Sequence, residues 1–252
     1  MLIFSLCFSL VQKKPYLCPL KIHYTMAKED YEITALFSTD GEVELRHCLS
    51  IELKGSNVSK NDLTVIMMNP GSASPAKESE KEVVSTDPTD IIKKLMEQPI
   101  PNCTLSYATE DPTIKQIIRV MEKYSFNQTT IINLSDIKNP ESTNFINYIK
   151  DKNVKTIEDE ALHSIFSTKN RKALNIVLSN SPKVLLAWGV SPRIKGLQEE
   201  AYNILKMLQE KYNFTLYGLP HKEKKRFGFY HPLPQEVEKQ QEWIEQQLNS
   251  IP

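Results

Sequence analysis

The sequence predicts a three-layer α/β sandwich with a central, mostly parallel β-sheet, and three observations support this prediction. Short apolar runs typical of strands buried on both faces recur at 63–68, 129–134 and 183–189, and a fourth short strand is predicted at 214–217. Amphipathic helical patterns lie between these runs. Strands that alternate with helices are typical of a parallel sheet covered by helices on both faces.

Residues 1–25 differ in character from the rest of the chain. The apolar run 1–11 is too short to span a bilayer, and two lysines follow it instead of preceding it. No small-residue cleavage site is evident, so a signal peptide fits poorly. Met26 opens a polar sequence, and we expect either that translation begins there or that 1–25 is a loose extension. We interpret 26–252 as a single domain, and we expect a monomer.

Composition limits the partners that the chain is expected to bind. Lys+Arg and Asp+Glu both number 31 among 252 residues, so any contact with nucleic acid must come from a local basic patch. The four cysteines form no Cys-x-x-Cys pair, which favours reduced thiols in a cytoplasmic protein over a zinc or iron–sulfur site. Glycine-rich phosphate loops, dinucleotide fingerprints and Gly-x-Ser-x-Gly motifs are absent from the sequence. We therefore expect no metal, no cofactor and no membrane association.

The remaining segments complete the expected domain. Turn residues at Asp40-Gly41 predict a hairpin between strands at 32–38 and 42–53. Residues 73–110 are rich in Ser, Pro, Glu and Lys, and they are predicted to form an inserted excursion or lid. Helices are predicted near 90–96, from Asp111-Pro112-Thr113 onward, over about 156–179, along the apolar stripe 194–208, and from 235 to about 248.

Candidate functional side chains lie at the predicted strand ends. Ligand sites in open α/β sheets lie at the carboxyl ends of the strands, which places Asn69, Asn133, Trp188 and the loop of His231 in one crevice. A side-chain amide such as that of Asn133 can read a base edge with one donor and one acceptor. Each position has a structural alternative, because Asn133 and Asp111 could cap helices and Trp188 could belong to the core.

The segment Asn69-Pro70-Gly71-Ser72 directly follows a predicted buried strand. The carboxamide of Asn69 can hold a water molecule but cannot remove a proton from it. Proline fixes the backbone, and glycine lets a ligand approach the chain closely. The alternative is an ordinary turn, because Asn, Pro and Gly are common turn residues.

His231 lies in a proline-rich loop next to a basic segment. The functional interpretation is an imidazole held beside a leaving group, and the alternative is a surface histidine. The cations and aromatic residues that precede it are Lys222, Lys224, Lys225 and Arg226, interleaved with Phe227, Phe229 and Tyr230. Cations bind phosphates and aromatic rings stack on bases, so this segment is a candidate DNA contact. The alternative is a solvated charged loop.

The order of these motifs resembles an uncharacterised bacterial family, the DUF1643 group, and also the uracil-DNA glycosylase superfamily. The resemblance spans most of residues 30–240 and rests on short motifs. These are Met67-Met68-Asn69-Pro70-Gly71-Ser72, Asp111-Pro112-Thr113, Ile132-Asn133-Leu134, Ala187-Trp188-Gly189 and Tyr230-His231-Pro232-Leu233. The resemblance implies a uracil-DNA glycosylase-like fold and hydrolysis of the N-glycosidic bond of a flipped DNA base.

The resemblance also implies a role for each matching residue. Asn69 would position the attacking water, Asn133 would read the pyrimidine edge, and His231 would stabilise the departing base anion. Asp111 and Trp188 would be further substrate contacts. The pocket would be lined by the backbone of Pro70, Gly71 and Ser72. The DNA would be contacted by the basic segment and by Tyr230, Pro232 and Leu233.

Departures from the glycosylase pattern suggest the substrate. Asn69 stands where uracil-specific members carry an aspartate, and mismatch-type thymine and uracil glycosylases also have an asparagine there. No strong anion is therefore expected at this position to face the sugar cation. The His-Pro motif also lacks its usual serine. Gly71 stands where uracil-specific enzymes have a tyrosine that blocks groups at C5 of the pyrimidine. We therefore expect a C5-modified pyrimidine, such as a modified base of phage DNA in a defence role. The alternative is a non-catalytic module that binds nucleotides or nucleic acid.

Overall fold

The computed structural model describes residues 30–56, 60–76, 89–98, 102–221, 227–234 and 237–248. The expected extension at 1–25 lies outside the described residues, and so does the basic segment 222–226. Within the part of the chain that is described, no helix is long and apolar enough to cross a membrane.

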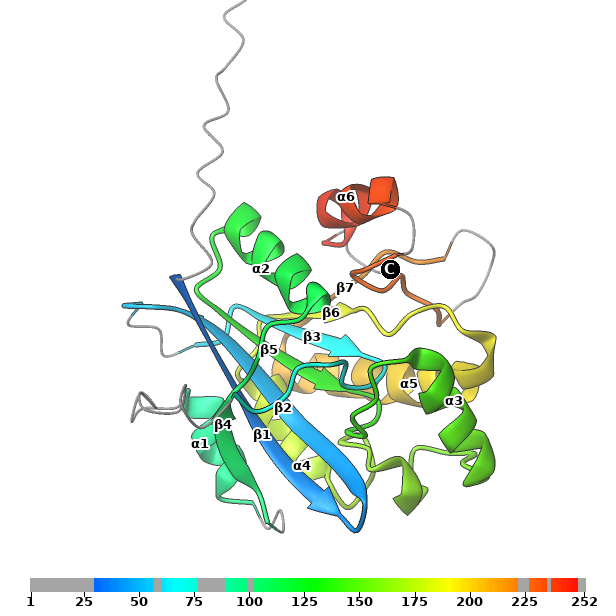
Figure 1. The fold of residues 1–252 in the computed structure, drawn as a ribbon. Coiled ribbons are helices and arrows are strands. Elements are labelled where there is room, and N and C mark those ends of the chain that lie inside the picture. The colour runs from blue at the N-terminus through cyan, green and yellow to red at the C-terminus, as the bar shows by residue number, and fades with distance from the viewer. Residues whose placement is uncertain are drawn as a thin grey trace, which may run out of the picture.

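A seven-stranded mixed sheet forms the centre of the molecule, in the order β4-β1-β2-β5-β3-β6-β7 (Figure 1). The strands are β1 (Tyr31–Asp40), β2 (Val43–Leu53), β3 (Leu63–Met67), β4 (Thr104–Tyr107), β5 (Gln128–Asn133), β6 (Lys183–Leu186) and β7 (Thr215–Tyr217). The half from β5 to β7 is parallel, as the apolar runs predict. The half formed by β4, β1 and β2 is antiparallel, and β2 also pairs antiparallel with β5. The α/β prediction is confirmed, but the sheet is parallel only in part.

Helices cover both faces of this sheet (Figure 1). The helices are α1 (Asp90–Met96), α2 (Pro112–Tyr124), α3 (Ser142–Asp151), α4 (Arg171–Ser179), α5 (Lys195–Tyr212) and α6 (Val237–Gln246). One face packs against α2 and α6, and we call the apolar cluster there the α2-side core. The other face packs against α1, α3, α4 and α5, and we call its cluster the α4-side core. Successive residues of a strand alternate between the two cores.

A β-bulge interrupts the hairpin of β1 and β2. The pairing changes from Leu36 opposite Cys48 to Phe37 opposite Arg46, so His47 is an extra residue in β2. Leu36 and Cys48 face the α4-side core, whereas Phe37 faces the α2-side core. Simple alternation from Cys48 would send Arg46 to the α4 side. The extra residue instead places Arg46 beside Phe37 on the α2 side.

Two predicted segments differ from the observed structure. Residues 104–107, which we expected within an excursion, form edge strand β4 against Thr34–Phe37. The helix expected over 156–179 forms only at α4. Upstream of α4, the carboxylate of Asp159 accepts hydrogen bonds from the amides of Lys155 and Thr156, and Glu158 accepts one from Thr168. Such local side-chain to backbone bonds compete with helix formation.

Two tryptophans hold the segment that carries His231. Trp188 is fully buried after β6, and its Nε1 donates a hydrogen bond of 2.7 Å to the carbonyl of Phe227. Nε1 of Trp243, in α6, donates to the carbonyl of Tyr230 at 2.9 Å. Between these anchors, the Phe229 ring packs edge-on against Trp188. Trp188 therefore lies in the core, which was the alternative to a substrate contact, and its hydrogen bond to Phe227 holds the loop that carries His231.

Gly218 and Gly196 provide a matched test of this packing. A Cβ at Gly218 would lie 2.8 Å from Cδ1 of Phe229 and 3.0 Å from the carbonyl oxygen of Leu186, whereas a Cβ at Gly196 in α5 would meet nothing within 4 Å. We expect Gly218→Ala to lower the free energy of unfolding by about 1–3 kcal/mol through overpacking. We expect Gly196→Ala to raise it by about 0.5–1 kcal/mol through helix propensity. Urea unfolding of both variants measures the difference, and equal effects would contradict the packing argument.

Candidate functional site

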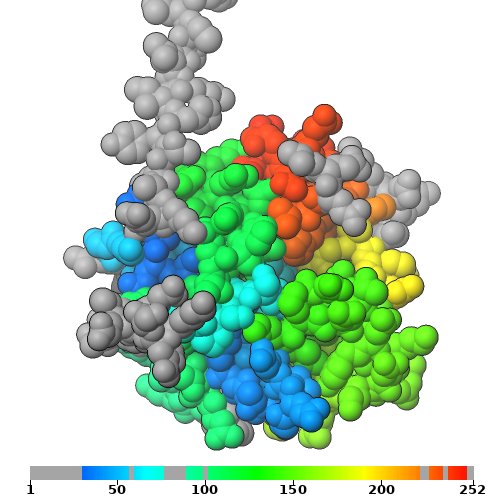
Figure 2. Space-filling model, viewed as in Figure 1, coloured from blue at the N-terminus to red at the C-terminus, as the bar shows by residue number. Residues whose placement is uncertain are grey.

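The carboxyl ends of the parallel strands meet at one edge of the sheet. Backbone hydrogen bonds join Leu134 to Met67 at 2.8 Å and Ser135 to Met68 at 3.1 Å, so the ends of β5 and β3 lie side by side. Figure 2 shows the segment after β3, in cyan, at the surface between α2 in green and the β1–β2 hairpin in blue. The strand-end rule therefore places Asn69 and Asn133 next to each other along adjacent strands, as predicted.

The Asn69 side chain ties two loops together. Its Nδ2 donates to the carbonyl oxygens of Pro70 and Asn139, each at 2.9 Å, and more weakly to that of Ile137 at 3.5 Å. The amide of Asn139 in turn donates to the Pro70 carbonyl at 3.0 Å. The nitrogen of the carboxamide is thus used structurally. Oδ1, which accepts no hydrogen bond from any described residue, is the atom that can orient a water molecule.

Gly71 lies directly against the Asp111 carboxylate. A Cβ at Gly71 would lie 3.0 Å from Oδ2 of Asp111, so a side chain at this position would displace the carboxylate. The other oxygen, Oδ1, caps α2 by accepting a hydrogen bond of 2.9 Å from the amide of Ile114. Asp111 therefore fills the space that we expected to be open beside Gly71. It also brings an anion into the crevice, beside the segment in which Asn69 stands in place of an aspartate.

Asn133 ends β5 as a fully buried side chain without a partner. It is 0% exposed, and neither Oδ1 nor Nδ2 makes a hydrogen bond to any described residue. Ile131, two residues earlier, belongs to the α2-side core, so Asn133 points to the α2 side as well. A buried carboxamide that satisfies neither its donor nor its acceptor is unusual and costs free energy. Asn133 does not cap a helix, which was the structural alternative.

Arg46 is a candidate site residue that the sequence analysis missed. It is 3% exposed on the α2 side, and its Nε and Nη1 make no hydrogen bond to any described residue. Burial lowers the pKa of Arg46 to about 10, and the charge of Asp111 partly opposes that shift. A guanidinium at this depth retains its charge at neutral pH. The signal in the sequence was an arginine between apolar residues of an expected strand, but the face to which it points depends on the bulge.

His231 is held as a neutral imidazole. Its Nδ1 accepts a hydrogen bond of 3.2 Å from the amide of Leu233, so the ring proton is carried by Nε2. Burial lowers the pKa of His231 to about 4, and the charge of Asp111 partly opposes that shift. His231 is consequently an uncharged hydrogen-bond donor at neutral pH.

The other predicted site residues occupy the rim of the crevice. Pro70 and Pro232 are buried, Leu233 and Tyr230 are partly buried, and Ser72 is exposed. The Tyr230 ring stacks on His221 with centroids 5.3 Å apart. The predicted cations Lys222, Lys224, Lys225 and Arg226 lie outside the described residues. Among the residues that the structure does describe, no group of three or more His, Cys, Asp or Glu side chains could hold a metal ion.

The structural use of the Asn69 amide predicts the result of restoring the aspartate of uracil-specific enzymes. Asn69→Asp replaces a donor with an oxygen that faces the carbonyls of Pro70 and Asn139. We expect the free energy of unfolding to fall by about 1–3 kcal/mol. Urea unfolding at pH 7 measures this loss. A variant as stable as the wild type would show that these hydrogen bonds are not needed.

The depressed pKa of His231 predicts a pH dependence of stability. An unfolded-state histidine titrates near 6.5, so between that pH and about 4 the unfolded chain binds a proton that the folded site excludes. Stability is therefore lost as the pH falls through this window, by up to about 2 kcal/mol between pH 7 and 5. We expect His231→Gln to lose less stability than the wild type over the same interval in urea titrations. Identical losses would contradict a buried neutral imidazole.

Comparison with known proteins gives a single match. No curated protein and no solved structure matches this chain. The sequence model of a family described as "Protein of unknown function (DUF1643)" matches residues 101–233, which is just over half of the chain. That match includes Asp111, Asn133, Trp188 and His231, whereas Arg46 and Asn69 precede it. The chain belongs to the DUF1643 family.

Proposed function

We propose that this protein is a DNA glycosylase that hydrolyses the N-glycosidic bond of a flipped, C5-modified pyrimidine. The observation that carries the proposal is the neutral His231, whose Nε2–H is available as a donor in the strand-end crevice. Breaking the glycosidic bond leaves its electron pair on the base. The fixed Nε2–H of the neutral imidazole can stabilise that developing anion by donating a hydrogen bond to it. A protonated histidine would favour the anion as well, but the buried site does not maintain that form at neutral pH.

The attacking water would be oriented by Oδ1 of Asn69. Water adds to C1′ of the sugar as the base departs, and the proton that the water loses ends on the base. Asp111 supplies a carboxylate near the Asn69–Gly71 segment, so the crevice has an anion to oppose the positive charge on the sugar. The crevice therefore contains a carboxylate although position 69 is an asparagine.

Recognition of the base would use the two unpartnered groups on the α2 side. Asn133 offers one donor and one acceptor, which matches the edge of a pyrimidine. Arg46 offers Nε–H and Nη1–H, two donors on different sides of the guanidinium that can each meet an acceptor of the ligand. A ligand that satisfied both groups would remove the cost of leaving them buried without partners.

The carboxylate beside Gly71 narrows the expected substituent at C5. Asp111 occupies the space next to Gly71, so the site there is polar and anionic instead of open. A carboxylate accepts hydrogen bonds, which favours a hydroxymethyl group and disfavours a carboxyl group. Since Asn133 is sealed from solvent, binding also requires the residues around it to move apart. Modified bases of this kind occur in phage DNA, and a role in phage defence follows from the proposal.

An abasic-site assay tests the proposal. Matched oligonucleotides would carry cytosine, thymine, uracil, 5-hydroxymethylcytosine, 5-hydroxymethyluracil or a glucosylated hydroxymethylcytosine, in single and double strands, with alkaline cleavage as the readout. We expect strands with hydroxymethyl groups to be cut. His231→Gln should reduce excision roughly 100–1,000-fold, the effect of removing one donor from a developing anion. His163→Gln, which alters a histidine outside the crevice, is the matched control and should retain activity.

Each result discriminates between functions. Cleavage of uracil strands with hydroxymethyl strands intact would refute the C5 preference while keeping glycosylase chemistry. Intact strands throughout, with binding by both the wild type and Asn69→Ala, would instead support a non-catalytic module. That module is the second candidate because Asn133 is sealed in this structure.

A further inference from the structure

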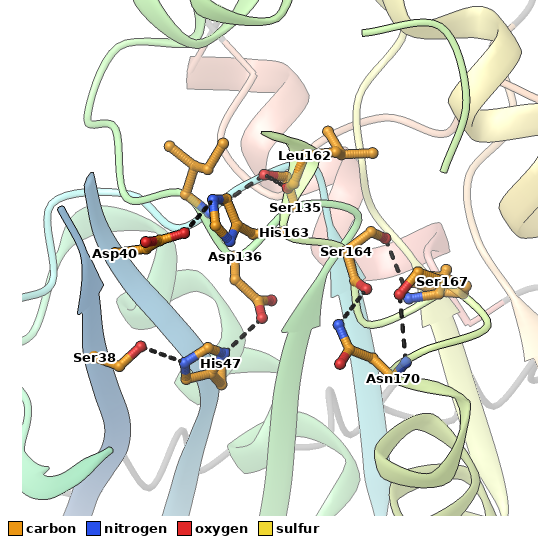
Figure 3. Close-up of polar contacts among 12 residues, drawn as sticks. Ser38, Asp40, His47, Ser135, Asp136, Leu162, His163, Ser164, Ser167 and Asn170 are labelled. Atoms are coloured by element: carbon orange, nitrogen blue, oxygen red, sulfur yellow. Dashed lines mark hydrogen bonds and ion pairs between the residues drawn. The ribbon is translucent and has the colours of Figure 1, made fainter. Parts of the chain in front are cut away.

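A second polar group lies on the hairpin of β1 and β2, apart from the strand-end crevice. Figure 3 shows the His47 ring between Ser38 and Asp136. Its Nε2 lies 2.7 Å from Oγ of Ser38, and its Nδ1 lies 2.7 Å from Oδ2 of Asp136. Because the carboxylate accepts from Nδ1–H, Nε2 is left as the acceptor for the serine hydroxyl. This is the arrangement in which a histidine removes the proton of a nucleophilic serine.

The three side chains come from separate parts of the fold. Ser38 lies in β1 opposite Leu45, and both face the α4 side. His47 is the extra residue of the bulge, a device that redirects side chains next to functional sites. Asp136 follows β5 and is fixed by its backbone, because its amide donates to His163 at 3.0 Å and its carbonyl accepts from Arg46 at 2.9 Å.

The Asp136 carboxylate is buried and lies near His47, His163 and Arg46. Burial raises the pKa of Asp136, and the hydrogen bond and charge of His47 oppose that shift, followed by His163 and Arg46. Oδ1 of Asp136 makes no hydrogen bond to any described residue, so His47 is the group that the carboxylate orients. Positive charge on His47 would be stabilised by this buried carboxylate.

Ser38 borders an open cleft that could admit a substrate. The cleft has a volume of about 460 Å³, and its lining includes Phe37, Ser38, Thr39, Thr104, Leu105 and Ser106. It forms because β4 pairs with β1 only as far as Phe37 opposite Thr104, which leaves 38–40 beyond the end of β4. None of the described residues that line it is charged. The cleft is therefore suited to a neutral acyl group.

Backbone geometry offers a donor for the carbonyl oxygen of such a substrate. The Asp40–Val43 pair closes a two-residue turn in which Gly41 has φ +57°. In an antiparallel pair, residues alternate between exchanging hydrogen bonds with the partner strand and directing them outward. The carbonyl of Ile33 accepts a hydrogen bond from the Ala108 amide, so Ile33 directs its backbone groups away from β2. Alternation along β1 gives the N–H of Thr39 the same direction, toward the edge that β4 leaves uncovered. That N–H belongs to the residue directly after Ser38.

We propose that Ser38, His47 and Asp136 form a second catalytic site that hydrolyses neutral esters through an acyl-serine intermediate. Oγ of Ser38 bonds to the carbonyl carbon while its proton passes to Nε2 of His47. The bond from that carbon to the leaving oxygen then breaks, and the leaving alkoxide takes the proton from Nε2. Water attacks the acyl-serine and transfers a proton through Nε2 back to Oγ, which releases the acid. This site does not depend on the proposed glycosylase activity, because its residues are distinct.

Covalent labelling with a fluorophosphonate tests the proposal on the full chain. Ser38 should displace fluoride from the probe and form a single phosphonyl adduct, which intact-mass spectrometry detects and peptide mapping assigns to Ser38. Ser38→Ala and His47→Gln should each abolish labelling. They should also reduce hydrolysis of p-nitrophenyl butyrate by at least about 100-fold. Ser179→Ala is the matched control, because that hydroxyl lies on α4, is not among the residues that line the cleft, and donates to the Ile176 carbonyl at 3.1 Å instead of to a histidine.

Two results would overturn the assignment. The first is folded wild-type protein that acquires no adduct, and the second is an adduct that peptide mapping assigns to a residue other than Ser38. The mapping uses the wild type alone, so the test stands even if a variant unfolds. Retention of full labelling and hydrolysis by Ser179→Ala supports the proposal, and their loss in that variant counts against it.

Discussion

The β-bulge at His47 determines where the polar side chains of this protein lie. Strand pairing is enforced by backbone hydrogen bonds and by burial of alternating residues on two cores, so a register change of one residue reverses the direction of every side chain beyond it. The bulge makes such a change once, between Cys48 and Arg46. As a result Arg46 faces the α2 side near Asp111, and His47 reaches Ser38 and Asp136. Neither arrangement would form in an uninterrupted hairpin.

The strand-end crevice contains more buried polar atoms without hydrogen-bond partners than a purely structural interior would. Asn133 and Arg46 are both buried with unpartnered atoms among the described residues, and the charge of Asp111 acts on Arg46. Unsatisfied buried groups of this kind each cost on the order of 1–3 kcal/mol, and the surrounding apolar packing must exceed that cost for the domain to fold. The two apolar cores on either side of the sheet supply that packing. Polar groups that the fold itself does not use are typical of a binding site.

The parts of this structure that sequence could predict are those set by local patterns. Apolar runs identified the central strands, and the strand-end rule placed Asn69, Asn133 and His231 near one edge of the sheet. The missed features depend on contacts between distant segments. Nothing in the local sequence shows that Asp111 fills the space beside Gly71, 40 positions away, or that 104–107 pairs with β1. The bulge is likewise invisible locally, because it is defined by the partner strand.

One backbone hydrogen bond connects the two polar groups. The amide of Arg46 donates to the carbonyl of Asp136 at 2.9 Å, while the guanidinium faces the α2 side and the Asp136 carboxylate meets His47. A ligand that drew the backbone of Arg46 toward it would pull on the residue that orients His47. Such coupling is reciprocal, since an effect of one site on the affinity of the other must be returned with equal free energy. The hairpin would then couple the two sites, so that ligand binding in the strand-end crevice on one face of the sheet would change the orientation of His47 on the other face.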